Sequence, residues 1–189
     1  IVLTNLGCHN NQLTSLDVSN NTALTILHCY SNQLTSLDVS GATALTDFQC
    51  QDNQLTSLYL SQNTALTTLW CWDNQLTSLD VSQNIVLTNL GCHNNQLTSL
   101  DVSNNTALTH FQCQDNQLTS LDVRNGNNTN FTSFFSFNNP NLYCIDVDDV
   151  AWADTNWTVA YNIDSTMSFS INCATAFGCL DPLACNYDS

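Results

Sequence analysis

The residues of this sequence that could do chemistry are ten cysteines, four histidines and sixteen acidic residues, all of them aspartate. Cysteine and histidine could bind a metal or form a nucleophile and base pair, and aspartate oxygens could bind calcium. Arg124 is the only Lys or Arg, and the chain has no Glu, so general acid–base catalysis has few candidates. No Ser–His–Asp, Cys–His or paired-carboxylate arrangement emerges. We therefore expect that the protein is not an enzyme and needs no cofactor.

Six cysteines recur 21 residues apart at one position of an internal repeat: Cys8, Cys29, Cys50, Cys71, Cys92 and Cys113. If the repeats form stacked parallel strands, neighbouring thiols lie about 5 Å apart. Parallel side-chain vectors then oppose the torsion angle of about 90° that a disulfide needs. A metal ion needs ligands that converge, and a column spreads them in a line. We interpret these residues as buried free thiols that act as small hydrophobes, with disulfides or a metal as the alternatives.

The repeat is marked by the tripeptide Asn-Gln-Leu, whose Asn recurs every 21 residues at Asn11, Asn32, Asn53, Asn74, Asn95 and Asn116. Leu and Cys in the segment L-x-C alternate with outward residues, as one buried face of a strand requires. The return segment L-D-V-S is expected to be extended or a short 3₁₀ turn, because the coil has no room for an ordinary helix. The Asn amides are expected to bond to the backbone at each bend. We predict a mainly β solenoid with a parallel β-sheet on its concave face and little or no helix.

The pattern L-x-x-L-x-C-x-x-N-x-L, as in residues 24–34, resembles the leucine-rich-repeat family, specifically the short cysteine-ladder type of internalin-J-like bacterial surface proteins. The segments N-P-N-L-Y-C-I-D-V-D-D and S-F-S-I-N-C resemble the C-terminal cap of secreted leucine-rich-repeat proteins from Bacteroidetes-type bacteria. The final G-C-L-D-P-L-A-C-N-Y-D resembles a small Cys-containing module of such chains, and it stops at Ser189 where that module normally continues. The resemblance implies an extracellular or cell-surface protein.

The chain then divides into four expected parts. Residues 1–123 hold six repeats, and residues 124–145 form a degenerate seventh in which Phe131 and Phe134 replace Leu and Ser136 replaces the column Cys. Residues 146–174 are expected to form a cap, because the last coil has no neighbour to cover its core. Residues 175–189 begin the truncated Cys-containing module. The aromatic residues expected to fold over the last coil are Trp152, Trp157, Tyr161 and Phe169.

Four cysteines depart from the period of the column. Cys144 and Cys173 bracket the expected cap and look like a disulfide, and Cys179 with Cys185 could close a second, local one. Disulfides favour an oxidising compartment.

Binding is expected where the near-identical repeats differ, at the outward strand positions of the concave sheet. Trp70 and Trp72 project there side by side, and an exposed Trp is unusual. They suggest a sugar-stacking or protein-docking patch, although the aromatics could merely pack on one another along the sheet. The candidate ligand-binding residues are His28, Tyr30, Gln49, Gln51, Asp52, Trp70 and Trp72. The four histidines lie on this face without converging, so no metal is assigned to them.

A repeated Asp forms a second row, at Asp17, Asp38, Asp80, Asp101 and Asp122. Calcium between the coils is one interpretation, but a single row lacks the convergent oxygens that calcium needs. The other interpretation is a row of solvated carboxylates bonded to local Ser and Thr hydroxyls.

Surface glycosylation is a further hypothesis. N-x-[ST] sequons begin at Asn20, Asn104, Asn127, Asn130 and Asn156. The tripeptide Asp164-Ser165-Thr166 resembles the O-glycosylation motif of Bacteroidetes-type secreted proteins, with Ser165 as the acceptor.

The net charge of −15 argues against nucleic acid as a partner, and no apolar run is long enough to insert into a membrane. We expect a non-enzymatic extracellular binding or adhesion scaffold that recognises a glycan or a protein through the concave face. The alternative is a homo-oligomer, a structural subunit of an extracellular filament stacked end to end.

The alternative rests on residues 1–25, which are identical to residues 85–109. The first coil therefore has the sequence of an internal coil. Its core side chains would be open to another subunit, although an upstream segment would cover them equally well. These side chains are Leu3, Leu6, Leu13, Leu16 and Val18.

Overall fold

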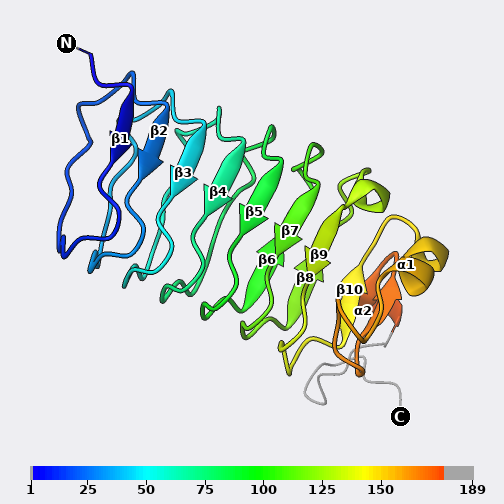
Figure 1. Cartoon of the computed structure of the whole chain (residues 1–189). Helices are drawn as coiled ribbons and strands as arrows, with labels where there is room; N and C mark the ends of the chain where they lie inside the picture. Colours follow the sequence, from blue (N-terminus) through cyan, green and yellow to red (C-terminus); the bar gives the residue numbers. More distant parts are fainter. Residues whose placement is uncertain (1, 177–189) are drawn as a thin grey trace, which may run out of the picture.

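The computed structural model describes residues 2–176, which form an elongated solenoid of stacked coils with a cap at its C-terminal end (Figure 1). Each coil contributes one strand to a seven-stranded sheet, the long sheet, and every strand pair in it is parallel. The predicted β solenoid with little helix is confirmed. The strands of the long sheet are β1 (Asn5–Gly7), β2 (Ile26–His28), β3 (Asp47–Gln49), β4 (Thr68–Trp70), β5 (Asn89–Gly91), β7 (His110–Gln112) and β9 (Ser133–Phe135).

A second parallel sheet, the short sheet, contains the return segments of the later coils and two strands of the cap. The first two return segments meet only through an isolated bridge between Asp17 and Asp38. The return side is therefore extended, one of the two conformations predicted for it. The strands of the short sheet are β6 (Ser99–Asp101), β8 (Ser120–Asp122), β10 (Cys144–Asp146) and β11 (Ser168–Ser170). The helices are η1 (Asn128–Asn130), α1 (Val150–Asn156) and α2 (Cys173–Ala176).

The register between neighbouring coils places equivalent repeat positions side by side. Leu27 pairs with Phe48, and Phe111 pairs with Phe134, so the middle residue of each strand forms one continuous inward column. These four side chains are almost completely buried. Each strand has one inward residue between two outward ones, because side chains alternate across a strand.

The Asn-Gln-Leu asparagines tie each coil to its neighbours, as the sequence predicted. The Nδ2 of Asn53 donates to the carbonyls of Cys29 and Cys50 at 3.1 Å, and its Oδ1 accepts from the amide of Leu34 at 2.9 Å. One side chain therefore satisfies backbone groups of two coils at a bend, where a strand ladder has ended.

A second asparagine column, which the sequence did not single out, performs the same task at another bend. The Nδ2 of Asn63 donates to the carbonyls of Val39 and Ala42 at 2.9 Å. Asn84 and Asn105 repeat these contacts in the following coils. The signal in the sequence was an Asn near the end of the repeat, which recurs 21 residues apart at Asn63, Asn84 and Asn105.

The cysteine column lies in the core, and all six thiols are free. Five are completely buried and Cys8, in the first coil, is only partly covered. Burial raises the pKa of the Cys29 and Cys71 thiols to about 12 and raises the pKa of Cys8 as well. The buried Ser136 continues the column in the seventh coil.

The cap covers the last coil with aromatic side chains. The ring of Trp157 lies 4.1 Å from Phe134 and 5.6 Å from Phe169, measured between ring centroids. The expectation for Tyr161 is wrong, because this side chain is 75% exposed, and Ile163 and Met167 are buried in its place. Tyr161 lies in a turn after α1 that reaches the last coil through Asn162 instead.

A disulfide joins Cys144 in β10 to Cys173 at the start of α2, with 5.8 Å between their Cα atoms. It ties the end of the cap to the short sheet. Cys179 and Cys185 lie outside the described residues. No helix among residues 2–176 is both long and apolar enough to span a membrane.

The first coil exposes less of its core than the sequence suggested. Leu3 is 39% exposed and Leu6, Leu13 and Leu16 are partly covered, whereas Val18 is buried and was wrongly expected to be open. Val18 follows the bridge between Asp17 and Asp38, so the second coil already shields it.

We predict that, of the six column cysteines, a thiol reagent modifies only Cys8 in the folded protein between pH 7 and 9. The thiolate is the reactive form, and the other five thiols are buried with a raised pKa, so they remain protonated. Mass spectrometry after alkylation of the native protein measures this. All six should react after denaturation without a reductant, and recovery of column cysteines as disulfides would contradict the prediction.

We predict that replacing both Cys144 and Cys173 by Ser lowers the free energy of unfolding by on the order of 3 kcal/mol, because the bond closes a loop of 29 residues. Hydrogen exchange should accelerate first in α1 and β11. The strands β2 to β5 serve as the internal control and should keep their protection. Unchanged melting together with unchanged exchange in the cap would show that the bond does not hold it.

Candidate functional site

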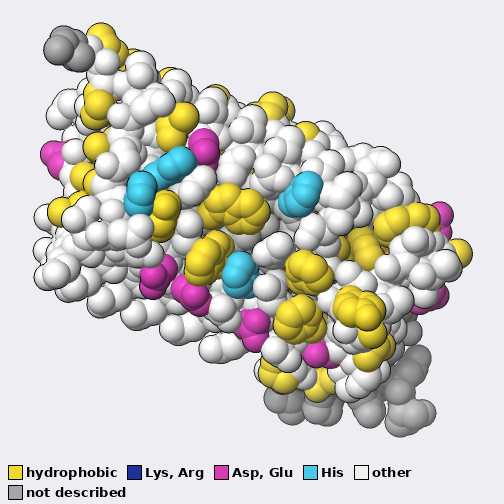
Figure 2. Space-filling view, viewed as in Figure 1, with side chains coloured by type: hydrophobic (Ala, Val, Ile, Leu, Met, Phe, Trp, Pro, Cys, Tyr) yellow, Lys and Arg dark blue, Asp and Glu magenta, His cyan; other side chains and the backbone are white. Residues whose placement is uncertain are grey.

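The outward face of the long sheet, here called the strand face, carries the side chains that differ between coils. Figure 2 shows hydrophobic side chains and histidines spread over this side of the molecule. Two outward rows matter for binding. The inner row is Gly7, His28, Gln49, Trp70, Gly91, Gln112 and Phe135. The outer row is His9, Tyr30, Gln51, Trp72, His93, Gln114 and Phe137.

The outer row packs on itself along the solenoid. The rings of His9 and Tyr30 are stacked at 4.4 Å, and those of Trp72 and His93 are stacked at 5.2 Å with an angle of 10° between their planes. Gln51 lies between these pairs in the row and is only 9% exposed. Much of the ring surface is therefore covered by neighbours, and Gln51 is not available to a ligand.

Trp70 in the inner row behaves differently, because its neighbour in the next coil is glycine. A Cβ on Gly91 would lie 2.3 Å from Cε3 and 2.6 Å from Cζ3 of Trp70. The indole therefore lies directly across the backbone of Gly91, which is buried beneath it, while Trp70 itself stays partly exposed. Only glycine leaves room for a ring at this distance.

The sequence contains a signal for this arrangement. Strand residue Trp70 pairs in register with Gly91, so the largest side chain of the row stands next to the smallest. Gly7 occupies the same position in the identical segment 1–25, and a Cβ there would meet only His9, at 3.8 Å.

A polar group is fixed beside Trp70. The Nε2 of His28 lies 3.0 Å from Oδ2 of Asp47, and the Nε2 of Gln49 donates to Oδ1 of Asp47 at 3.1 Å. Gln49 is the register partner of Trp70. Asp47 is thus a site residue that the candidate set lacked, and it orients two members of that set.

Of the remaining candidates, Tyr30 stacks on His9 and lies 6.5 Å from His28 between ring centroids. Asp52 is not an outward strand residue. Its φ of 55° places it at the left-handed turn position that Asp or Asn occupies in most coils, and its carboxylate accepts from the hydroxyl of Ser31 at 2.8 Å. The structure therefore brings together His28, Gln49 and Trp70, and separates Gln51 and Asp52 from them.

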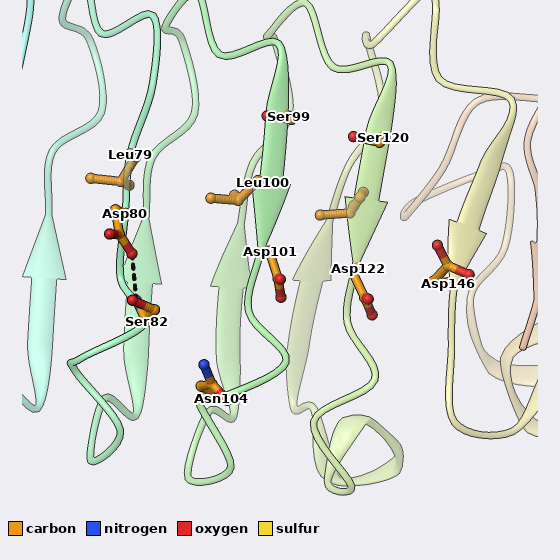
Figure 3. A pocket seen from close by; sticks show the side chains of 11 residues that line it. Leu79, Asp80, Ser82, Ser99, Leu100, Asp101, Asn104, Ser120, Asp122 and Asp146 are labelled. Carbon is orange, nitrogen blue, oxygen red and sulfur yellow. Dashed lines mark hydrogen bonds between the residues drawn. The ribbon is translucent and has the colours of Figure 1, made fainter. Parts of the chain in front are cut away.

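A groove of about 470 Å³ lies on the return side, over β6 and β8. Figure 3 shows Asp80, Asp101, Asp122 and Asp146 in a row along it. Each repeated Asp accepts a hydrogen bond from the backbone amide two residues later, as Asp80 does from Ser82 at 2.9 Å. These bonds lower the pKa of the Asp80 carboxyl.

The last two carboxylates of this row, Asp122 and Asp146, share one guanidinium. The guanidinium of Arg124 donates to Asp122 and reaches Asp146 at 3.8 Å. The part of the chain that the structure describes contains no group of three or more His, Cys, Asp or Glu residues placed to hold a metal ion. The calcium interpretation therefore gains no support from the geometry.

The glycosylation candidates differ in accessibility. Asn20, Asn104, Asn130, Asn156 and Ser165 are exposed. Asn127 is partly buried, and its Nδ2 donates to the carbonyl of Leu108 at 3.2 Å, which leaves it poorly placed for modification.

Comparison with known proteins agrees with the geometry. The architecture is that of a leucine-rich-repeat solenoid with an internal cysteine column. Over 88% of its length the chain is similar to the functional domain of InlJ from Listeria monocytogenes, which includes a cysteine ladder, with 32% identity and a TM-score of 0.57. It covers 43% of that domain. No family model and no curated protein matches the chain.

Two further structures share the fold at lower identity. The internalin InlF of Listeria monocytogenes is 23% identical with a TM-score of 0.68, over 88% of this chain and 47% of that one. The ectodomain of the receptor kinase GASSHO1/SCHENGEN3 from Arabidopsis thaliana, in complex with CASPARIAN STRIP INTEGRITY FACTOR 2, is 22% identical with a TM-score of 0.63, over 77% of this chain and 18% of that one. The chain thus spans less than half the length of these structures.

We predict that Gly91→Ala displaces the Trp70 ring and destabilises the fold by about 1–3 kcal/mol, because the new methyl group overlaps the indole. Tryptophan emission should shift to longer wavelength and become more sensitive to acrylamide quenching. Gly7→Ala is the matched control, because Gly7 holds the equivalent position in the identical segment 1–25 and a Cβ there would come no closer than 3.8 Å to His9. This variant should change neither the stability nor the tryptophan emission. Equal behaviour of the two variants would show that Trp70 does not depend on Gly91.

Proposed function

We propose that the protein is a non-enzymatic binding scaffold that recognises a protein or glycan ligand through the strand face, in an extracellular or cell-surface setting. The observation that carries the proposal is the placement of Trp70 across Gly91, with part of its ring exposed beside the group formed by His28, Asp47 and Gln49. A flat aromatic anchor next to fixed polar groups is the usual composition of a binding hot spot.

The scaffold holds this site rigidly. Backbone bonds from coil to coil flank the site, such as the amide of Cys50 to the carbonyl of Trp70 at 2.8 Å and the amide of Cys71 to the carbonyl of Gly91 at 2.9 Å. Side chains on such a ladder lose little further freedom when a ligand binds, so less of the binding free energy is lost to ordering.

The comparisons support a binding role at the level of the fold. A leucine-rich-repeat ectodomain with a similar fold has been solved in complex with CASPARIAN STRIP INTEGRITY FACTOR 2. Solenoids of this kind present their strand surface to ligands. No nucleic acid partner is expected at a net charge of −15.

The disulfide between Cys144 and Cys173 supports an oxidising location. The six free thiols are compatible with such a location, because five are completely buried and the pKa of each is raised by burial.

End-to-end assembly through the first coil is the second candidate. Leu3, Leu6, Leu13 and Leu16 are partly exposed, and covering them would be favourable. The burial of Val18 weakens this candidate, since the open apolar area is smaller than the sequence suggested. Light scattering at high concentration measures assembly directly, and a charged substitution at Leu6 should reverse any that occurs.

We predict that Trp70→Ala weakens ligand binding roughly thirtyfold, corresponding to about 2 kcal/mol for loss of an aromatic anchor. The measurement is a screen of immobilised neutral and acidic glycans and of extracellular protein domains, followed by surface plasmon resonance on each hit. Tyr59→Ala is the matched control, because Tyr59 is an aromatic that is 79% exposed on the return side. Hits that lose affinity with Tyr59→Ala and keep it with Trp70→Ala would move the site away from the strand face.

A further inference from the structure

A separate cavity of about 240 Å³ lies where the cap meets the last strand of the long sheet. Five of its lining residues come from the seventh coil, three come from α1 and the residue after it, and one is Asn162 in the turn that follows. Hydrophobic side chains also gather towards this end of the molecule in Figure 2. The residues that matter here are Thr132, Ser133, Phe135, Trp152, Asn156 and Trp157.

Two indole rings form a corner of this cavity. Trp152 and Trp157 stand at 88° to each other with 5.5 Å between their centroids. Trp157 is buried against Phe134, whereas Trp152 is partly exposed. The carboxylate of Asp149 accepts from the backbone amide of Trp152 at 3.0 Å, which caps α1 and fixes the backbone that carries this ring.

The edge of β9 supplies an unpaired acceptor. In the preceding coils the carbonyl of the equivalent Thr accepts from amides of the next coil, as that of Thr109 does from Thr132 at 2.8 Å. The cap replaces the missing coil only in part. The Nδ2 of Asn162 donates to the carbonyl of Phe134 at 2.7 Å, and the backbone carbonyl of Asn162 accepts from the amide of Ser136 at 2.8 Å. No backbone donor among residues 2–176 reaches the carbonyl of Thr132.

Asn156 brings a second polar group to the cavity. Its Nδ2 donates to the carbonyl of Trp152 at 2.8 Å, which fixes the direction of the amide. Within the described residues its Oδ1 accepts no hydrogen bond from the protein. Both the Thr132 carbonyl and the Asn156 amide therefore have acceptor capacity left for a ligand.

The lining carries no charged side chain, although the whole chain has a net charge of −15. A charged ligand would lose hydration here without gaining an opposite charge, so the cavity favours a neutral one. Its volume lies below the roughly 300–1,000 Å³ of pockets for drug-sized molecules, so a single ring fits best. A ligand with hydroxyl donors at its edge and apolar C–H groups on its face matches both the acceptors and the indoles.

We propose that this cavity is a carbohydrate subsite that binds one neutral pyranose ring, with a C–H face of the sugar on Trp152 and hydroxyl groups donating to the Thr132 carbonyl and the Asn156 amide. It is distinct from the strand-face site around Trp70 and does not depend on that proposal.

The test is saturation-transfer difference NMR with the methyl glycosides of glucose, galactose, mannose and N-acetylglucosamine, and with methyl glucuronide as the charged comparison. At least one neutral glycoside should receive saturation at its ring C–H protons, and the glucuronide should not. Trp152→Ala and Asn156→Ala should each weaken binding about tenfold, as loss of one aromatic or one hydrogen-bonding contact implies. Trp70→Ala should leave it unchanged.

Asn156→Ala decides the outcome if Trp152→Ala loosens the cap, because Asn156 is exposed and contributes little to packing. No transfer to any neutral glycoside would overturn the proposal, as would equal transfer to the glucuronide. A sugar that binds and is lost with Trp70→Ala but not with Asn156→Ala would also overturn it, while supporting the strand-face site instead.

Discussion

The parallel, in-register pairing of each coil with the next is the constraint on which the rest of the structure depends. Backbone groups bond between coils at the same positions every 21 residues, from the amide of Cys8 to the carbonyl of His28 onwards. Any side chain at a repeated position must therefore stack on copies of itself. The two asparagine columns, the leucine column and the cysteine column are consequences of this geometry.

The same constraint disfavours catalysis and favours binding. A column spreads identical groups along a line, whereas catalytic and metal sites need unlike groups that converge on one point. The five buried thiols are consequently protonated and inert in the core, and the repeated aspartates of the return side accept hydrogen bonds from the backbone amide two residues later. The strand face, by contrast, presents rows of differing side chains on a rigid sheet. Such rows are suited to recognising an extended surface.

Both proposed sites occur where the repetition is interrupted. Trp70 can lie across the sheet only because Gly91 breaks the row, and the cavity beside α1 exists because the cap imitates a next coil incompletely. Among the described residues no backbone donor reaches the carbonyl of Thr132, because the last coil has no neighbour of its own kind, and for the same reason Trp157 covers Phe134. Departures from the repeat therefore mark the positions where a ligand can add contacts that the fold does not satisfy.

The sequence by itself determined the period, the inward positions and the bend role of the Asn-Gln-Leu asparagines. These follow from alternation within a strand and from a fixed repeat length, and both are local patterns. Tertiary structure alone decided that the return side is extended, that Gln51 is buried, that Tyr161 is exposed and how closely the Trp70 ring lies over Gly91. Each of these depends on contacts between residues at least one coil apart, or on how an irregular cap closes over the last coil, and no periodic pattern encodes such contacts.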